Sequence, residues 1–230
     1  MDATEYRRAI GCLRYLLHTR PDLSYAVGMA SRFMEKPIVM HQKAVKQILR
    51  YLQGTLEYGL VYTQENKTEV LVGYSNSDHA GDVVGRRSTA GMAFYLNDSL
   101  ITWNSHKEKT VALSSCESEF MAATAAARQG LWLRSLLVEI TDKPPQSVKM
   151  FVDNNSAIAL MKNPVFHGRS KHIDVKYHFI RECVERGQFQ VKRVCTEGQR
   201  ADALTKALPA VKLGIMRHLL GVRDLSECQN

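Results

Sequence analysis

The sequence predicts an α/β fold in which a mixed sheet is flanked by helices and preceded by a small helical segment. Apolar side chains recur at three- and four-residue steps through the first sixty residues, which is the period of a helix. Short β-type runs follow, and strand-like and helix-like segments alternate in the last third of the chain. Several strands, then a helix, then strand–helix pairs are typical of a mixed sheet covered by helices. A chain of 230 residues has room for one or two such domains.

The leading helical segment contains three amphipathic stretches. The first runs from Tyr6 to Leu17. The second begins near Pro21, because a first helical turn tolerates proline. The third includes Ile48 and ends at Gly54, a residue type that commonly terminates helices.

The remaining elements are expected in a strand-rich block followed by alternating strands and helices. β-type runs occupy residues 60–62, 70–74, 91–95, 100–103, 148–152 and 189–194. Helices are expected over about 115–140, 154–162, 173–186, 200–207 and 208–220. Asn97-Asp98 is the predicted turn of a hairpin. Pro144-Pro145 is expected to end the long helix, because a residue before proline avoids the helical region.

Composition and charge limit the classes of function. The net charge of +8 attracts polyanions, of which nucleic acid is the commonest inside cells, although a generic basic surface is the alternative. No membrane-spanning run of about 18 apolar residues and no apolar N-terminal signal occur, so we expect an intracellular protein, cytoplasmic or nuclear, without a membrane partner. The five scattered cysteines contain no Cys-x-x-Cys pair, which argues against a disulfide framework and a zinc site. We expect free, mostly buried thiols.

Three acidic residues lie in frames that could supply one metal site. Glu119 and Asp202 each lie near a predicted helix start, and Asp153 directly follows the apolar run 148–152. Mg²⁺ prefers oxygen ligands, and phosphodiester hydrolysis uses carboxylates brought together from distant elements. Taken singly, each residue is equally a helix cap or a partner of the helix dipole. Taken together on rigid strand and helix ends, they predict a metal site.

Several longer blocks occur in an order that resembles the copia-type retrotransposon polyproteins. These blocks are Tyr74–Asp82, Arg86–Gly91, Val111–Glu119, Val152–Ala157, Lys171–Arg181 and Ala201–Lys206. The resemblance is to the ribonuclease H domain of those polyproteins and covers roughly residues 68–208. Residues 1–62 resemble the helical, thumb- or connection-like end of the preceding reverse transcriptase. Residues 209–230 are similar to the usual C-terminal helix and tail.

This resemblance implies a ribonuclease-H-like five-stranded mixed sheet and hydrolysis of the RNA strand of RNA–DNA hybrids. It implies two Mg²⁺ or Mn²⁺ ions per site and no small-molecule cofactor. The four carboxylate positions of the family fall on position 76, Glu119, Asp153 and Asp202. Glu119 matches better than Glu117, because the apolar–alanine stretch 120–123 follows it.

Position 76 is where the sequence departs from the family pattern, since it holds Asn76 instead of aspartate. Asparagine offers one neutral oxygen where two charged ones are expected, so we expect weakened metal binding and impaired hydrolysis. Asp78 on the same strand face is an alternative ligand. Two residues along a strand span about 6.6 Å, however, whereas metal ligation tolerates only tenths of an ångström. The alternative function is a non-catalytic nucleic-acid-binding remnant.

A second departure concerns the polymerase. The chain contains no Tyr-x-Asp-Asp and no other Asp-Asp pair. We therefore expect no DNA synthesis, and we interpret the chain as a truncated reading frame or a fragment. The expected partners are an RNA–DNA hybrid and the rest of a reverse transcriptase.

Basic residues in the family blocks are candidates for binding the hybrid through its phosphates. Two of them, Arg86 and Arg87, follow the predicted strand that leads to Asn76. The others belong to the block before the last strand: Lys171, His172, Lys176 and Arg181. A solvated basic face is the alternative interpretation for this second group.

Overall fold

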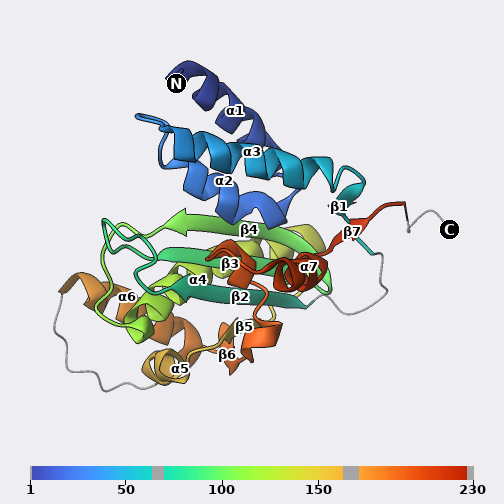
Figure 1. The fold of residues 1–230 in the computed structure, drawn as a ribbon. Helices are drawn as coiled ribbons and strands as arrows, with labels where there is room; N and C mark the ends of the chain where they lie inside the picture. Colours follow the sequence, from blue (N-terminus) through green and yellow to red (C-terminus); the bar gives the residue numbers. More distant parts are fainter. Residues whose placement is uncertain (1, 64–69, 163–170, 227–230) are drawn as a thin grey trace. The chain divides into compact units, whose positions relative to one another are not determined.

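The computed structural model describes residues 2–63, 70–162 and 171–226, with the side chains of 171–177 also outside the description. The chain divides into two compact units (Figure 1). One unit combines Met1–Tyr62 with Ala207–Asn230, and the other is Thr63–Lys206. The C-terminal segment, which the sequence suggested as a separate part, thus belongs to the unit of the N-terminal helices.

The first unit is built from helices and one small two-stranded sheet. Its elements are α1 (Ala3–Leu16), η1 (Pro21–Leu23), α2 (Ser24–Ser31), α3 (Val39–Gln53), β1 (Tyr58–Leu60), α7 (Ala210–Leu219) and β7 (Val222–Asp224). Ile10, Val27 and Ile48 from the three leading helices share one apolar core, as their spacing predicts. The strand expected at 60–62 begins two residues earlier. It pairs with β7 in a sheet of its own rather than with the larger sheet.

The second unit is organised around a five-stranded mixed sheet. Its strands are β2 (Leu71–Asp78), β3 (Thr89–Leu96), β4 (Ser99–Lys107), β5 (Val148–Val152) and β6 (Phe189–Arg193). Their order across the sheet is β4-β3-β2-β5-β6. β2, β3 and β4 are antiparallel, whereas β5 is parallel to both β2 and β6. The predicted mixed sheet is therefore confirmed, with β2 at its centre.

Helices α4 (Ser115–Thr141), α5 (Asn155–Lys162) and α6 (Lys171–Glu185) accompany this sheet (Figure 1). The long α4 lies against β2, and Gly130 permits its close approach. A Cβ atom at Gly130 would lie 2.9 Å from Phe189 and 3.0 Å from Phe94, two side chains of the buried core. α4 ends at Asp142 in the left-handed region, two residues before Pro144, as expected.

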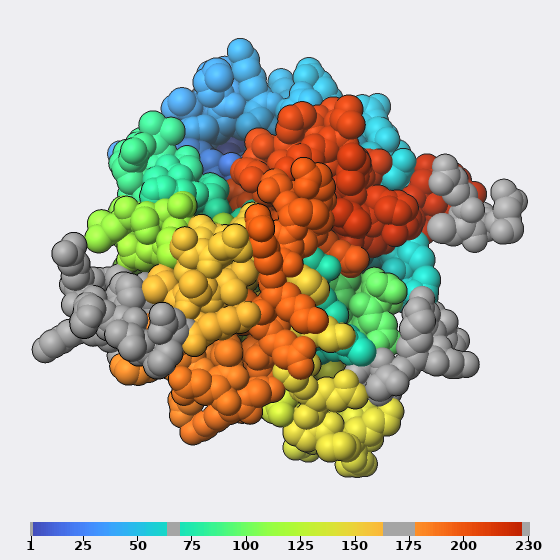
Figure 2. Space-filling view, turned by 90° about the horizontal axis from the view of Figure 1, so that it is seen from below, coloured from blue at the N-terminus to red at the C-terminus, as the bar shows by residue number. Residues whose placement is uncertain are grey.

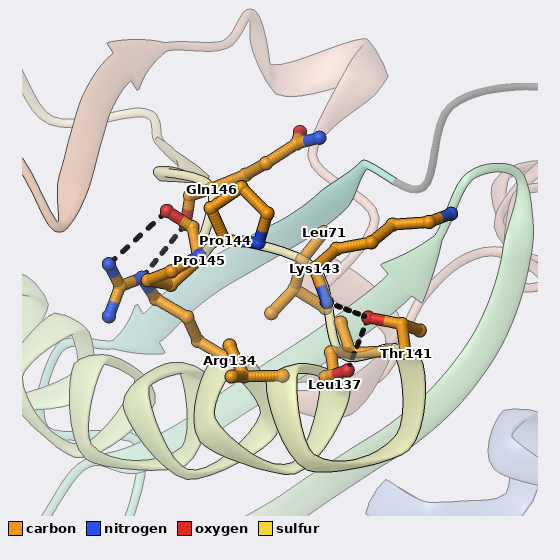
Figure 3. Close-up of a pocket in the computed structure, with 9 residues that line it drawn as sticks. Leu71, Arg134, Leu137, Thr141, Lys143, Pro144, Pro145 and Gln146 are labelled. Carbon is orange, nitrogen blue, oxygen red and sulfur yellow. Dashed lines mark hydrogen bonds between the residues drawn. The ribbon is translucent and has the colours of Figure 1, made fainter.

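A surface pocket lies where α4 ends and the chain approaches β5 (Figure 3). Arg134 donates from Nε to the carbonyl oxygen of Gln146 at 2.8 Å and holds this proline-containing turn. Leu71, the first residue of β2, also lines the pocket, whose lining contains no acidic side chain. The pocket therefore belongs to the opposite end of β2 from Asn76.

Several expectations from the sequence were wrong. Residues 200–207 do not form an α-helix but only a short 3₁₀ turn, η3 (Asp202–Leu204), which follows η2 (Thr196–Gly198). Cys12 and Cys195 are exposed rather than buried. On α4 the side chain of Trp132 is 58% exposed, because the helix packs on the sheet through small residues on its other side. Among the helices described, none is long and apolar enough to cross a membrane.

Candidate active site

The four positions predicted for the carboxylate site come from four separate elements of the second unit. Asn76 lies near the end of β2, and Glu119 lies in the second turn of α4. Asp153 directly follows β5, and Asp202 begins η3. Tyr74 and Phe151 are paired across β2 and β5, two residues before Asn76 and Asp153 respectively. Because neighbouring parallel strands lie about 4.8 Å apart, both positions reach the same edge of the sheet.

Glu119 is a buried carboxyl group with only one satisfied oxygen. Its side chain is buried, and Oε1 accepts a hydrogen bond from the Ser77 main-chain N–H at 3.0 Å. Oε2 is buried and has no hydrogen-bond partner in the described part of the chain. Burial, and after it the charge of Asp153, raise the pKa of Glu119 to about 8. A buried carboxyl with an unsatisfied oxygen is typical of a ligand or catalytic group.

Asp202 is also buried, but its carboxylate has both a hydrogen-bond donor and a cationic partner. Its Oδ1 accepts from Nδ2 of Asn76 at 2.8 Å and lies 2.6 Å from Nζ of Lys206. Asp153 is partly buried, and burial is the largest cause that raises the pKa of its carboxyl group. The negative charge of Asp202 contributes to the same shift. The three carboxyl groups therefore interact electrostatically at this edge of the sheet.

The segment that carries Asp202 lies directly on the sheet because Gly91 leaves room for it. Gly91 pairs with Asn76 across β2 and β3. A Cβ atom there would lie 2.8 Å from both Cβ of Leu204 and Cγ2 of Thr205. Figure 2 shows the orange part of the chain, which includes β6 and the approach to this segment, on the face seen from below, whereas Asp202, Leu204 and Thr205 themselves are buried. A glycine inside a strand commonly marks such a close approach, so this signal was available in the sequence.

Two further residues, which the sequence analysis did not identify, hold the same segment. The buried side chain of Gln199 donates from Nε2 to the carbonyl oxygen of Ser75 at 2.9 Å. The guanidinium of Arg200 lies over the ring of Tyr95 at 4.5 Å and over that of Tyr74 at 5.1 Å. These contacts join residues far apart in sequence, and local patterns carry no signal for them.

Two other acidic residues near the site, Asp78 and Glu117, hydrogen-bond to main-chain N–H groups and support local structure. Asp78 accepts through Oδ1 from the main-chain N–H of Thr89, and its other oxygen lies against Gly81, so its carboxylate supports the β2–β3 connection. Glu117 accepts through Oε2 from the N–H of Leu113 at 2.8 Å and belongs to the cap of α4. Glu117 therefore has a structural partner at the start of α4, and the assignment of the catalytic position to Glu119 stays a prediction.

The candidate hybrid-binding residues fall into three groups. Arg86 and Arg87 are exposed on the β2–β3 connection, which leaves the sheet at the edge of the carboxyl groups. Arg181, expected to contact phosphate, is buried and donates from Nε to the carbonyl oxygen of Leu160 at 3.1 Å. It joins α6 to α5, so its expected role as a surface contact was wrong. The side chains of Lys171, His172 and Lys176 lie outside the described residues.

The donor set fits a divalent cation only in part. Carboxylate oxygens are the ligands that Mg²⁺ and Mn²⁺ prefer, and Oε2 of Glu119 is buried without a partner. Oδ1 of Asp202, in contrast, already receives two N–H donors. Within the described residues, no three acidic, histidine or cysteine side chains are arranged as a ready ligand cluster. Glu119 and Asp153 therefore fit such an ion better than Asp202 does.

The fold defines the class of protein. The five-stranded mixed sheet with flanking helices is the ribonuclease-H-like fold. Solved structures of the foamy viral protease-reverse transcriptase resemble the chain at TM-scores of 0.54 (the dRH form with double-stranded DNA) and 0.51 (with RNA/DNA hybrid). The identities are 11% and 12%, covering 90% of this chain and 32% and 26% of those chains.

Sequence relatives identify the family. The chain is 40% identical over 225 residues to the retrovirus-related Pol polyprotein from transposon TNT 1-94 of Nicotiana tabacum, covering 97% of this chain and 17% of that protein. It is 42% identical over 223 residues to the retrovirus-related Pol polyprotein from transposon RE1 of Arabidopsis thaliana. That match covers 94% of this chain and 15% of that protein. No family model matches. The chain belongs to the copia-type retrotransposon Pol polyproteins as a ribonuclease-H-like domain with flanking segments, and it spans less than a fifth of these relatives' length.

Proposed function

We propose that this chain binds RNA–DNA hybrids and hydrolyses the RNA strand with the help of divalent cations, at a rate limited by Asn76. The observation that carries the proposal is the buried Glu119, whose unpartnered oxygen lies in a site with Asp153 and Asp202. Carboxyl groups held together in this way are costly without a cation, and they are typical of functional sites. A bound divalent cation would supply water activation and charge neutralisation at the phosphodiester.

Asn76 lowers the negative charge of this site by one unit relative to an aspartate. Its amide N–H groups face Asp202 and Thr205, at 2.8 and 3.1 Å, so they point where an aspartate would present a second oxygen. A cation is repelled by N–H groups and attracted by oxygens. The proposal therefore predicts weak hydrolysis by the natural chain and a gain when the carboxylate is introduced.

The test is cleavage of a labelled RNA–DNA hybrid in Mg²⁺ and in Mn²⁺ by the natural chain, by Asn76→Asp and by Asn104→Asp. Asn104 is exposed on β4, so this control adds the same charge to the same sheet outside the site. We expect Asn76→Asp to cleave at least about 10–100-fold faster, the range found when support of a metal site is altered, with no gain for the control. Equal rates for all three chains would show that Asn76 does not limit hydrolysis.

The alternative, a non-catalytic hybrid-binding domain, is favoured by the engagement of Asp202 with Asn76 and Lys206. It predicts salt-sensitive hybrid binding without cleavage by either folded variant. We expect Arg86→Ala with Arg87→Ala to reduce the slope of log affinity against log salt by about one for each lost phosphate contact. Arg128→Ala, an exposed change on α4, is the control and leaves the slope unchanged.

A further inference from the structure

The orientation of the Asn76 amide can be deduced from its neighbours. Oδ1 of Asp202 is an acceptor, and the hydroxyl of Thr205 already donates to the main-chain oxygen of Asp202 at 3.1 Å. Both atoms lie within hydrogen-bond distance of the same end of the Asn76 amide, at 2.8 and 3.1 Å. Only an NH₂ group can satisfy two acceptors, so Nδ2 must face Asp202.

The other end of the amide faces Glu119. The Ser77 N–H is shared between Oδ1 of Asn76 at 2.9 Å and Oε1 of Glu119 at 3.0 Å. Asn76 thus presents an oxygen towards the Glu119 side of the site and hydrogen atoms towards the Asp202 side. An aspartate would present an oxygen to both sides, so the asparagine makes the two sides of this position chemically different.

Lys206 completes this asymmetry. Its ammonium nitrogen lies 2.6 Å from Oδ1 of Asp202, whose side chain is fully buried. With Asn76 neutral, the charges of Asp202 and Lys206 cancel. The Glu119 side has the carboxyl groups of Glu119 and Asp153, which a bound cation would hold in their charged forms, and Oε2 of Glu119 is without a partner in the described part of the chain. A divalent cation is therefore attracted to the Glu119 side and finds no net charge at Asp202.

The Asp202 segment also keeps its position without a cation. Gln199 bonds to the main chain of β2, Arg200 lies on two tyrosine rings, and Gly91 lets the turn lie on the sheet. These contacts lie within the second unit. No second ion is needed to hold Asp202 where it is.

We propose that this chain holds a single divalent cation, bound by Glu119 and Asp153 on the side of the Asn76 amide oxygen, while the Asn76 N–H and the Lys206 ammonium replace a second cation at Asp202. This inference deepens the proposed function, because it concerns the same site. Two carboxylates with water and substrate phosphate form a common environment for Mg²⁺. The Asp202 side then serves as an internally neutralised support.

The test is the number of Mn²⁺ ions bound per full chain, measured from the electron paramagnetic resonance signal of free Mn²⁺. We expect one ion for the natural chain, loss of that ion in Glu119→Gln, and two ions in Asn76→Asp with Lys206→Met. Lys192→Met, an exposed change on β6, is the matched control and keeps one ion. Asn76→Asp alone retains Lys206 as a counter-ion, and we expect its second ion to bind at least about 10-fold more weakly than in the double variant.

Two ions, or none, in the natural chain would overturn the inference, as would a single ion in both Asn76→Asp chains. Retention of the ion in Glu119→Gln would overturn it as well. Thermal unfolding by circular dichroism establishes that each counted variant is folded. The expected counts without cleavage of hybrid by any variant would contradict the proposed hydrolysis and leave the single-ion site standing.

Discussion

Two buried carboxylates, one in each unit, differ in how their charge is satisfied. Asp22 in the first unit accepts from Nε of Arg20 at 3.0 Å and from Nη2 at 2.8 Å, and its Oδ2 also accepts from the hydroxyl of Tyr51 at 2.7 Å. Arg20 donates further to the carbonyl oxygen and hydroxyl of Thr55. Glu119 has a single N–H donor for two oxygens.

This difference separates a structural carboxylate from a functional one. A buried ion pair with complete hydrogen bonding is neutral as a unit, and it joins η1 to the end of α3. A buried carboxyl group that lacks partners keeps the ability to bind a cation or a proton. Burial alone therefore does not identify the site; the unsatisfied oxygen does.

The largest expected effect comes from breaking the satisfied pair. Asp22→Asn leaves the buried Arg20 guanidinium without its counter-ion, and we expect the first unit to lose about 3–5 kcal/mol of unfolding free energy. Urea unfolding of the full chain measures this loss. Glu57→Gln, the same chemical change at an exposed position of that unit, is expected to stay within about 0.5 kcal/mol. A cost as small for Asp22→Asn as for the control would mean that the pair does not support the unit.

Replacing the unsatisfied carboxyl group of Glu119 is expected to raise the free energy of unfolding, whereas replacing Asp22 lowers it. The pKa of Glu119 is raised to about 8 in the folded chain, from an ordinary value of 4.5. The folded state therefore holds a proton that the unfolded state has released between these two values, and stability from this group falls as the pH rises through that window. At pH 8 we expect Glu119→Gln to be more stable than the natural chain by about 1–3 kcal/mol, the cost of an unsatisfied buried group.

Thermal unfolding at several pH values without divalent cations measures this dependence. The two chains should be equally stable near pH 4, where Glu119 carries a proton in both states. Added Mg²⁺ should reduce the difference in stability between the two chains at pH 8, because it stabilises only the natural chain. A difference in stability between the two chains that does not change with pH would show that Glu119 is not the titrating group.

The smallest effect concerns the support of Asp202. Gly91→Ala places a methyl group 2.8 Å from Leu204 and Thr205, and we expect a loss of about 1 kcal/mol as the turn moves off the sheet. Gly214→Ala in α7 is the control, since no atom lies within 4 Å of the new Cβ, and helix propensity should make it neutral or stabilising. A Gly91→Ala chain as stable as the natural one, with unchanged hybrid cleavage, would show that this close approach is dispensable.

Much of the fold could be predicted from local patterns. The hairpin turn at Asn97, the end of α4 before Pro144 and the alternation after residue 148 all follow from turn chemistry and periodicity. The segment after Gln199 could not be predicted in this way. Its residues favour a helix locally, but Asp202 and Thr205 bond to Asn76 of a strand that is more than one hundred residues away.

The sequence alone determined the residue types at the site: three carboxylates, an asparagine at the fourth carboxylate position of the family, and a basic loop that follows it. Only the tertiary structure decided which of those carboxylates lacks a partner. Hydrogen bonding depends on directions and distances of a few tenths of an ångström between distant segments, and sequence spacing carries no such information. For that reason the sequence showed that a charge is missing at Asn76. Only the folded chain showed that the Asn76 N–H and the Lys206 ammonium both contact Asp202.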